Sequence, residues 1–357
     1  MCAAVRCDRV TLAPYTTLRL GGPASRFVEV ADTDELIAEV TAADRAREPL
    51  LVLGGGSNLV IADSGFDGTV VHVATRGVDT APEAGGRVRV RVRAGEEWDP
   101  FVARCVADGL SGVECLSGIP GLVGSTPIQN VGAYGQEVAQ TITEVRVLDR
   151  TTGRVATMDH ADCAFTYRNS VFKGTDDYVV LDVTFALDPT GMSAPIRYAE
   201  LARTLGAAPG DRLPAEDARA AVLGLRRGKG MVVDPADPDT RSAGSFFTNP
   251  ILDPDAFAGL EHRVADRLGP GVEFPRYPEP DGRTKTSAAW LIERAGFTKG
   301  YARGPARIST KHTLALTNPG DGTTADLLAL AREVRAGVHE AFGVTLTNEP
   351  VLVGAAL

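Results

Sequence analysis

Two glycine-rich stretches carry the residue types and spacing that suit ligand chemistry. The first, inside LVLGGGSNLVIADSGFDGTVVHV, interrupts two apolar runs with Gly54, Gly55, Gly56, Ser57 and Asn58. Successive backbone N–H groups in a tight glycine turn can converge on phosphate oxygens, and the serine and asparagine side chains add donors. Taken alone, a triple glycine is more often a tight turn between strands.

The second stretch is SGIPGLVGSTPIQNVGAYGQEV, in which three glycines recur at every third residue before two planar amides and an aromatic ring. Its candidate ligand contacts are Gly118, Gly121, Gly124, Ser125, Gln129, Asn130, Gly132 and Tyr134. Neither stretch has the pattern of a P-loop or of a Gly-x-Gly-x-x-Gly turn. Two such loops on strand-rich subdomains suit a long ligand with a diphosphate and a flat ring, which is the shape of a flavin dinucleotide.

Apolar runs and one alternating run predict the strands that position these loops. PLLVLGGG and GTVVHVA flank the first loop as buried strands, and a helix is expected from Thr33 to Arg45 with Asp32 or Thr33 as its cap. In GRVRVRVRAGEEW the valines 88, 90 and 92 alternate with arginines. A solvated arginine face is favoured there over an anion-binding stripe.

Further periodic segments complete a strand-rich α+β first part. Strands are expected at TEVRVLD, RVATMD and YVVLDVTFAL, and helices at WDPFVARCVADG, closed by Gly109, and at AEDARAAVLGLRRGKG. From Met231 onward, Pro- and Gly-rich loops surround short helical pieces. The last helix is expected from Thr324 to Phe342, and its apolar stripe is Leu327, Ala331, Val334, Val338 and Phe342.

The length, composition and net charge of the chain limit the class of protein and the kinds of partner that it can bind. With 357 residues, 44% hydrophobic and 23% charged, the chain is an ordinary globular sequence of two or three domains. A formal net charge of −9 argues against a general nucleic-acid or anionic-membrane surface, although a local basic pocket remains possible. Without a signal sequence or a long apolar span, the chain is expected to be cytoplasmic, with no membrane insertion.

Cysteine and histidine usage argues against disulfides and metal sites. The five cysteines, odd in number and scattered, are expected to be reduced thiols: Cys2, Cys7, Cys105, Cys115 and Cys163. The five histidines form no His-x-x-x-His pair, so no metal site is expected.

Seven segments in order resemble one enzyme family. LGGGSNLVI, SGIPGLVGSTPIQNVGAYGQEV, FTYRNSVFK, IRYAELA, SAGSFFTNP, SAAWLIERAGF and LTNEPVLVG are similar to segments of the UDP-N-acetylenolpyruvylglucosamine reductase (MurB) family, and the similarity extends from about Tyr15 to Gly354. The region after Ser245, with a tyrosine in IRYAEL, resembles the family's tyrosine-loop subtype.

The resemblance implies an α+β fold with a two-subdomain FAD-binding part of the vanillyl-alcohol-oxidase type and a C-terminal α+β substrate-binding domain. The implied domains are residues 1–75, completed by about 345–357, then 76–230, and then the substrate domain at 231–344. FAD and NADPH are the implied cofactors. The implied reaction converts UDP-N-acetylenolpyruvylglucosamine to UDP-N-acetylmuramate, a peptidoglycan precursor, and protein partners stay unknown.

The same resemblance assigns catalytic roles to three residues. Arg168 in YRNS matches the arginine that stabilises the enolate, and Glu349 in NEPVLVG matches the catalytic glutamate. A glutamate beside developing negative charge helps if it is protonated or if it holds the arginine, so a pKa raised by burial is expected for Glu349. Ser245 in AGSFF matches the proton donor to the α-carbon. The loop residues 54–58 and 118–135 match the family's flavin contacts, whereas Gln129 and Asn130 are either flavin ligands or loop scaffolding.

Substrate contacts are also implied. They are Tyr198, Arg226, Lys229, Asn249 and His312. Three departures from the family pattern bear on them: Thr248 replaces a lysine, Asn169 replaces an aspartate, and the segment from Ser309 to His312 replaces a His-x-x-Gln. His312 is interpreted either as a polar contact in place of the glutamine or as an ordinary loop histidine.

Two other functions remain alternatives. A flavin oxidase or dehydrogenase of the same fold would share the glycine loops, since fold does not fix function. A non-catalytic nucleotide-sugar sensor would keep the pocket and lose the catalytic residues. The presence of Arg168, Ser245 and Glu349 together favours the reductase over both.

Overall fold

The structure is a computed structural model that describes residues 5–357, and it divides into two compact units. Unit 1 contains residues 5–10, 24–56 and 66–228, and unit 2 contains residues 11–23, 57–65 and 229–357. Cys2 lies outside the described residues. The grouping places residues 57–65 and 345–357 in one unit with the expected substrate domain, while the three-domain boundaries stay a prediction.

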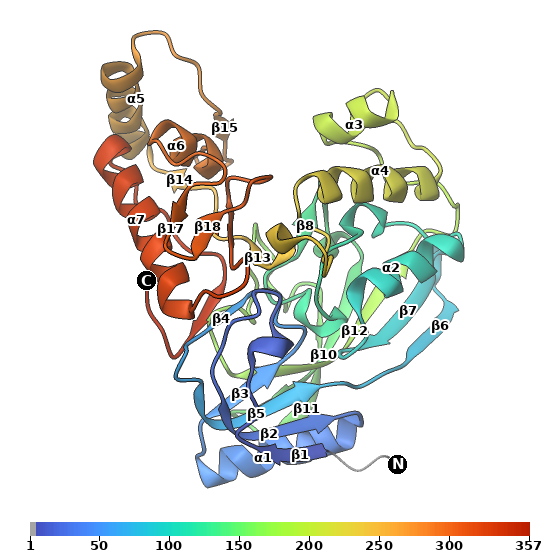
Figure 1. Cartoon of the computed structure of the whole chain (residues 1–357). Coiled ribbons are helices and arrows are strands. Elements are labelled where there is room, and N and C mark those ends of the chain that lie inside the picture. The colour runs from blue at the N-terminus through green and yellow to red at the C-terminus, as the bar shows by residue number, and fades with distance from the viewer. Residues whose placement is uncertain (1–4) are drawn as a thin grey trace. The chain divides into compact units, whose positions relative to one another are not determined.

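The first sheet of unit 1 follows from a β-α-β segment. Its strand order is β1-β2-β5-β3, with β2 and β3 parallel to β5 and β1 antiparallel to β2. The bounds are β1 (Val5–Asp8), β2 (Ala24–Val30), β3 (Leu50–Leu53) and β5 (Phe66–Val73). Helix α1 (Thr33–Ala46) packs against β2, β3 and β5 (Figure 1). Asp32 caps this helix by accepting the N–H groups of Asp34 and Glu35, as the sequence predicts.

The second sheet of unit 1 is antiparallel, and it confirms the strands expected in this region. Its order is β11-β10-β12-β7-β6. The bounds are β6 (Val78–Pro82), β7 (Val88–Arg93), β10 (Ile142–Asp149), β11 (Arg154–Asp159) and β12 (Tyr178–Leu187). Val90 and Val92 are buried in the core on one face. The contrast between the two faces follows from the period of two along a strand.

The opposite face of this sheet carries a charge network. The buried carboxylate of Asp182 accepts hydrogen bonds from Arg91 Nε at 2.6 Å, Arg146 Nε at 2.6 Å and Arg93 Nη1 at 3.3 Å. The Arg91 and Arg93 side chains remain 39% and 29% exposed, so this face is solvated as expected, and the buried aspartate on the neighbouring strand adds ion pairs to it.

Three helices and one short hairpin complete unit 1. They are α2 (Trp98–Ala107), α3 (Ala199–Leu205), α4 (Ala215–Gly228), β8 (Gly132–Ala133) and β9 (Gln136–Glu137). Trp98 and Phe101 of α2 pack on Phe185 of β12 in the main core. A smaller core holds α3 and α4 together around Leu201 and Val222.

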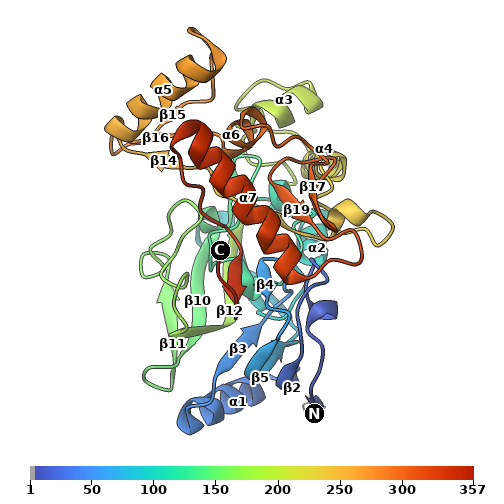
Figure 2. The same ribbon diagram turned by 60° about the vertical axis from the view of Figure 1, so that its left-hand side comes forward.

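Unit 2 is assembled from short strands and three helices. Its sheets are β13-β19-β18-β17, β14-β16-β15 and the parallel pair β20-β4. The strand bounds are β4 (Leu59–Ile61), β13 (Ser242–Ser245), β14 (Ile251–Leu252), β15 (Tyr277–Pro278), β16 (Thr284–Lys285), β17 (Ala302–Arg303), β18 (Ala306–Ile308), β19 (Ala315–Thr317) and β20 (Val351–Val353). The helices are α5 (Pro254–Leu268), α6 (Ala288–Arg294) and α7 (Thr324–Phe342). Helix α7 has the bounds that the sequence predicts, and it packs with its buried apolar stripe on α5, α6 and the sheet strands β17–β19 (Figure 2).

Among residues 5–357, no helix has both the length and the apolar character needed to cross a membrane.

Candidate active site

The two glycine loops touch each other in unit 1. Gly54 and Gly55 follow β3, and a Cβ atom added to Gly55 would lie 2.7 Å from Gly121 Cα. A Cβ atom on Gly54 would lie 2.7 Å from Ser125 Oγ. Such distances are far inside van der Waals contact, so only glycine permits this approach. The first loop therefore needs its glycines for contact with the second loop, an arrangement that presents the backbones of both at one place.

The second loop is anchored by a partly buried ion pair that sequence reasoning missed. Asp99, in the first turn of α2, accepts the Gly118 N–H at 2.6 Å and two hydrogen bonds from Arg219 of α4 at 2.6 and 3.1 Å. Burial alone raises the pKa of Asp99, but the hydrogen bonds from Arg219 and Gly118 outweigh it and leave the pKa below the ordinary value. The aspartate is thus ionised at neutral pH.

Arg168 lies in a strained turn whose guanidinium points back to the glycine loop. Reciprocal backbone hydrogen bonds between Thr166 and Asn169 close the turn, and Arg168 has a φ of 53°. Its Nη2 donates to the Gly132 carbonyl at 2.6 Å. Lys173 Nζ donates to the Arg168 carbonyl at 2.9 Å. A left-handed non-glycine residue held by several contacts is typical of functional sites.

Asn130 shares the left-handed backbone, with a φ of 45°, but its side chain faces inward. It is 1% exposed and donates to Glu137 Oε2 at 2.8 Å and to the Thr166 carbonyl at 3.0 Å. Its amide oxygen accepts the Ala139 N–H at 3.2 Å. Of the two alternatives for Asn130, this geometry favours loop scaffolding. Gln129 is half-buried beside it.

Three more of the expected ligand contacts gather within unit 1. Tyr134 and Tyr198 form an edge-to-face ring pair with centroids 5.4 Å apart, and Tyr198 is 44% exposed at the start of α3. Arg226 of α4 is buried, and it interacts electrostatically with Tyr134 and Asp99. Burial lowers the pKa of Arg226 to about 10, and the interactions with Tyr134 and Asp99 oppose that shift.

In unit 2 the backbone joins Ser245, Glu349 and Asn58. Ser245 ends β13, and the next residue, Phe246, accepts the Glu349 N–H at 2.9 Å. Asn58 Nδ2 donates to the Glu349 carbonyl at 3.5 Å, and the Asn58 carbonyl accepts the Val351 N–H at 2.9 Å. Residues that are far apart in the sequence thus become neighbours, and two of the three expected catalytic residues belong to one unit.

Asn249 and His312 also belong to unit 2, where one lies beside the beginning of a helix and the other lies in a turn between two strands. The Asn249 amide oxygen accepts the Ala288 N–H at 3.0 Å, at the beginning of α6. His312 lies in the turn between β18 and β19, where Ser309 Oγ accepts its N–H at 3.2 Å. Because Ser245 pairs with Ala315 of β19, this turn adjoins the end of β13.

Four described cysteines are free thiols: Cys7, Cys105, Cys115 and Cys163. Within residues 5–357, no three His, Cys, Asp or Glu side chains are grouped to hold a metal ion.

Two family models match the chain. The FAD binding domain matches residues 24–159, and the UDP-N-acetylenolpyruvoylglucosamine reductase C-terminal domain matches residues 235–353. The UDP-N-acetylenolpyruvoylglucosamine reductase of Thermobifida fusca (strain YX) is 66% identical over 348 residues, which are 98% of both chains. The chain belongs to this reductase family. The expected enzyme class and the cofactors FAD and NADPH are thereby confirmed.

Other relatives agree. The reductase of the same name from Streptomyces coelicolor is 62% identical over 97% of this chain and 90% of its own length. The crystal structure of the MurB reductase from Thermus caldophilus, at 27% identity, covers 98% of this chain and 99% of its own, with a TM-score of 0.65. The expected fold class is confirmed: a flavin-binding part of the vanillyl-alcohol-oxidase type precedes the family's C-terminal domain.

Proposed function

We propose that the chain reduces UDP-N-acetylenolpyruvylglucosamine to UDP-N-acetylmuramate with NADPH, as a step of peptidoglycan precursor synthesis. The observation that carries the proposal is the 66% identity to a reductase of this name over 98% of both chains. The touching glycine loops of unit 1 support it, because they suit FAD: their close approach leaves backbone N–H groups rather than side chains to meet a pyrophosphate. Residues 54–58, 118, 121, 124, 125, 129, 132 and 134 are the proposed FAD-binding positions, and Asn130 is the proposed scaffold of the second loop.

The reaction adds a hydride to the β-carbon and a proton to the α-carbon of the enolpyruvyl group. The two glycine loops would hold FAD, which would supply hydride chemistry between NADPH and the β-carbon. Addition there moves an electron pair toward the α-carbon and the carboxylate, giving an enolate. The protein must stabilise that charge and then deliver a proton.

Arg168 is the proposed stabiliser of the enolate. Its guanidinium is always charged and can donate two parallel hydrogen bonds to a carboxylate-like group. The Gly132 carbonyl and the closed turn at residues 166–169 already restrict its orientation, so little conformational entropy is lost when it binds the developing charge.

Ser245 is the proposed proton donor. A serine hydroxyl is a weak acid, but the enolate carbon that accepts its proton is strongly basic. The pairing of β13 with β19 fixes the Ser245 backbone at the end of a strand.

Glu349 is proposed to act either as a neutral acid that donates a hydrogen bond to the enolate or as a carboxylate that orients the arginine. The hydrogen bond from its backbone N–H to Phe246 keeps it beside Ser245. The remaining proposed substrate contacts are Tyr198, Arg226, Lys229, Asn249 and His312.

An anaerobic absorption spectrum tests the proposal. We expect a flavin band in the purified protein that NADPH bleaches and that the enolpyruvyl nucleotide sugar then restores. A band that only oxygen restores would support a flavin oxidase. Binding of the nucleotide sugar without flavin reduction by NADPH would support a sensor.

A further inference from the structure

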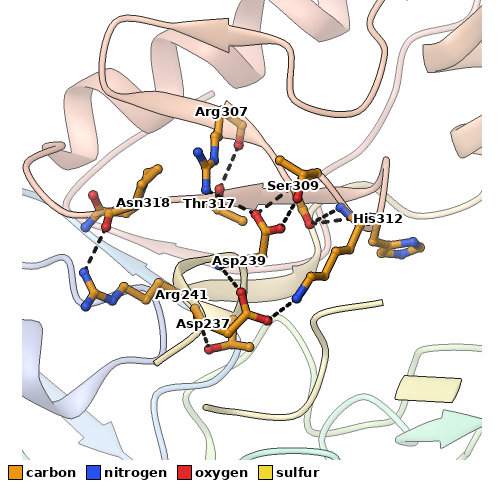
Figure 3. A network of polar contacts seen from close by, with 12 residues as sticks. Asp237, Asp239, Arg241, Arg307, Ser309, His312, Thr317 and Asn318 are labelled. Atoms are coloured by element: carbon orange, nitrogen blue, oxygen red, sulfur yellow. Dashed lines mark hydrogen bonds and ion pairs between the residues drawn. The ribbon is translucent and has the colours of Figure 1, made fainter. Parts of the chain in front are cut away.

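A buried aspartate joins the segments of unit 2 that follow Lys229 and precede His312. Asp239 is 3% exposed and lies in the short 3-10 helix η6 (Pro238–Thr240). Its carboxylate accepts the N–H of Thr310 at 3.3 Å and, through a short hydrogen bond, the Thr310 hydroxyl (Figure 3). One side chain thus fixes the turn between β18 and β19 to the segment that leads into β13.

Two ion pairs join the same two segments, and in both the aspartate belongs to the first segment and the basic residue to the second. Arg307 Nη2 of β18 lies 3.5 Å from Asp239, and Lys311 Nζ donates to Asp237 at 2.5 Å (Figure 3). The ion pair raises the pKa of Lys311 and lowers that of Asp237, so both stay charged at neutral pH. Acidic groups of the residue 237–239 turn therefore face basic groups of the residue 307–311 turn.

Gly230, the residue next to Lys229, lies close to both Asp239 and Lys311. Gly230 has a φ of 65°, and a Cβ atom placed on it would lie 3.3 Å from Asp239 Cβ and 3.5 Å from Lys311 Cδ. The backbone after Lys229 is thus packed between Asp239 and the methylene groups of Lys311. Moving either side chain would displace the segment that carries Lys229.

We propose that Asp239 is a positioning residue for nucleotide-sugar binding. By hydrogen-bonding Thr310 and packing on Gly230, it sets the relative places of two segments that carry proposed substrate contacts, those of Lys229 and His312. This proposal rests on the function proposed above. Ser245 is held by contacts that do not involve Asp239 or Thr310, because it pairs with Ala315 of β19 and the Phe246 N–H donates to the Leu314 carbonyl at 2.7 Å. Loss of the contact between Asp239 and Thr310 therefore weakens substrate binding and leaves proton delivery in place.

Two variants disrupt this contact in different ways, and two variants serve as controls. Asp239→Asn removes the charge, and Thr310→Val removes the hydroxyl donor at nearly constant volume. Thr310→Ser keeps the hydroxyl and should restore function. Asp281→Asn makes the same charge change at an exposed loop residue whose carboxylate accepts hydrogen bonds from Arg283.

We expect Asp239→Asn and Thr310→Val to raise the KM for the enolpyruvyl nucleotide sugar about tenfold with kcat within about twofold of wild type, the signature of lost uniform binding. Direct titration of the oxidised enzyme with the nucleotide sugar, followed by flavin absorbance, should show the same loss of affinity. Thr310→Ser and Asp281→Asn should match wild type. FAD content should be unchanged in all four.

An unchanged KM in folded Asp239→Asn or Thr310→Val protein would overturn the proposal, as would Thr310→Ser behaving like Thr310→Val. If Asp239→Asn does not fold, the KM of Thr310→Val alone tests the proposal: a raised KM supports it and an unchanged KM overturns it. Wild-type protein that the nucleotide sugar neither binds nor reoxidises would instead remove the proposed function, and this proposal with it.

Discussion

Arg168 is a residue whose backbone and side chain are both constrained. Its backbone has a left-handed φ of 53°, and its guanidinium is held on the glycine loop by hydrogen bonds from Nη2 to the Gly132 carbonyl at 2.6 Å and from Nη1 to the Asn130 carbonyl at 3.5 Å. A lysine in this place would keep the charge and lose the planar, multiple donors.

Arg168→Lys should therefore lower the rate of flavin reoxidation by the enolpyruvyl substrate about 100-fold, because a donor aimed at developing charge is lost. Stopped-flow absorbance would measure that rate. Arg154→Lys, at an exposed residue of β11, is the matched control. If the reoxidation rate of Arg168→Lys is within twofold of wild type, a group other than Arg168 stabilises the enolate.

Glu349→Gln tests whether this glutamate works as an acid. If its carboxyl is protonated in the reacting complex, the reoxidation rate falls as pH rises through the pKa of the carboxyl. This falling limb of the pH profile should disappear in the variant. The pH profile of single-turnover reoxidation checks this. Glu340→Gln, at an exposed helix residue, should keep the wild-type profile. A limb that persists in Glu349→Gln would contradict the acid role.

The sequence predicts site residues whose chemical type is distinctive, and it misses those whose role depends on packing. Arg168, Ser245 and Glu349 stand in motifs that a resemblance can reveal. Asp99 and Asp239 are single aspartates in ordinary contexts, and only the fold brings Gly118 and Thr310 to them. Asn130 has a type that suits either ligand or scaffold, and its burial favours scaffold.

At the scale of elements, the contact between the two glycine loops is the most demanding feature. Gly55→Ala would place a methyl group 2.7 Å from the Gly121 backbone, so the loops must separate. We expect FAD affinity to fall at least about tenfold, because backbone groups aimed at one ligand move apart. Fluorescence titration of the apoprotein with FAD measures this.

Gly259→Ala provides the matched control for that substitution. Gly259 lies within α5, and no heavy atom lies within 4 Å of the place a Cβ atom would take. Alanine there should leave FAD affinity unchanged and stabilise the helix by up to about 1 kcal/mol. Equal FAD affinity in Gly55→Ala and wild type would mean that the loops tolerate separation.

Element types follow well from the sequence because local patterns determine them. The stripe at residues 327–342 gives α7 its observed bounds, and the alternation at residues 88–93 gives β7. Strand partners do not follow, since pairing depends on residues far away in the chain. Nothing local to Leu59–Ile61 indicates that β4 pairs with β20 rather than with the neighbouring β3 or β5.

At the scale of the whole molecule, burial separates the cysteines into two classes. Burial raises the pKa of Cys105, Cys115 and Cys163 to about 12, whereas Cys7 is exposed. The thiolate is the reactive form, and at pH 8 a pKa of about 12 leaves about one thiol in ten thousand ionised.

Alkylation at pH 8 should therefore modify Cys7 in the native protein and leave the three buried thiols intact, as peptide mapping by mass spectrometry would show. Reaction at these three sites should appear only after denaturation, which is the positive control. Native labelling of Cys105 at the rate of Cys7 would show that unit 1 opens readily.

The pairing of β4 with β20 has a consequence for how the protein is made. Asn58 and Glu349, 291 positions apart, meet across that pairing. A ribosome synthesises Asn58 nearly three hundred codons before Glu349. The contact between them can therefore form only after most of the chain has been translated. Once residue 228 has been translated, unit 1 has all its segments, whereas unit 2 then has only two short pieces. A nascent chain can thus acquire its flavin-binding loops early, but the Ser245–Glu349 neighbourhood forms only after translation has passed residue 353.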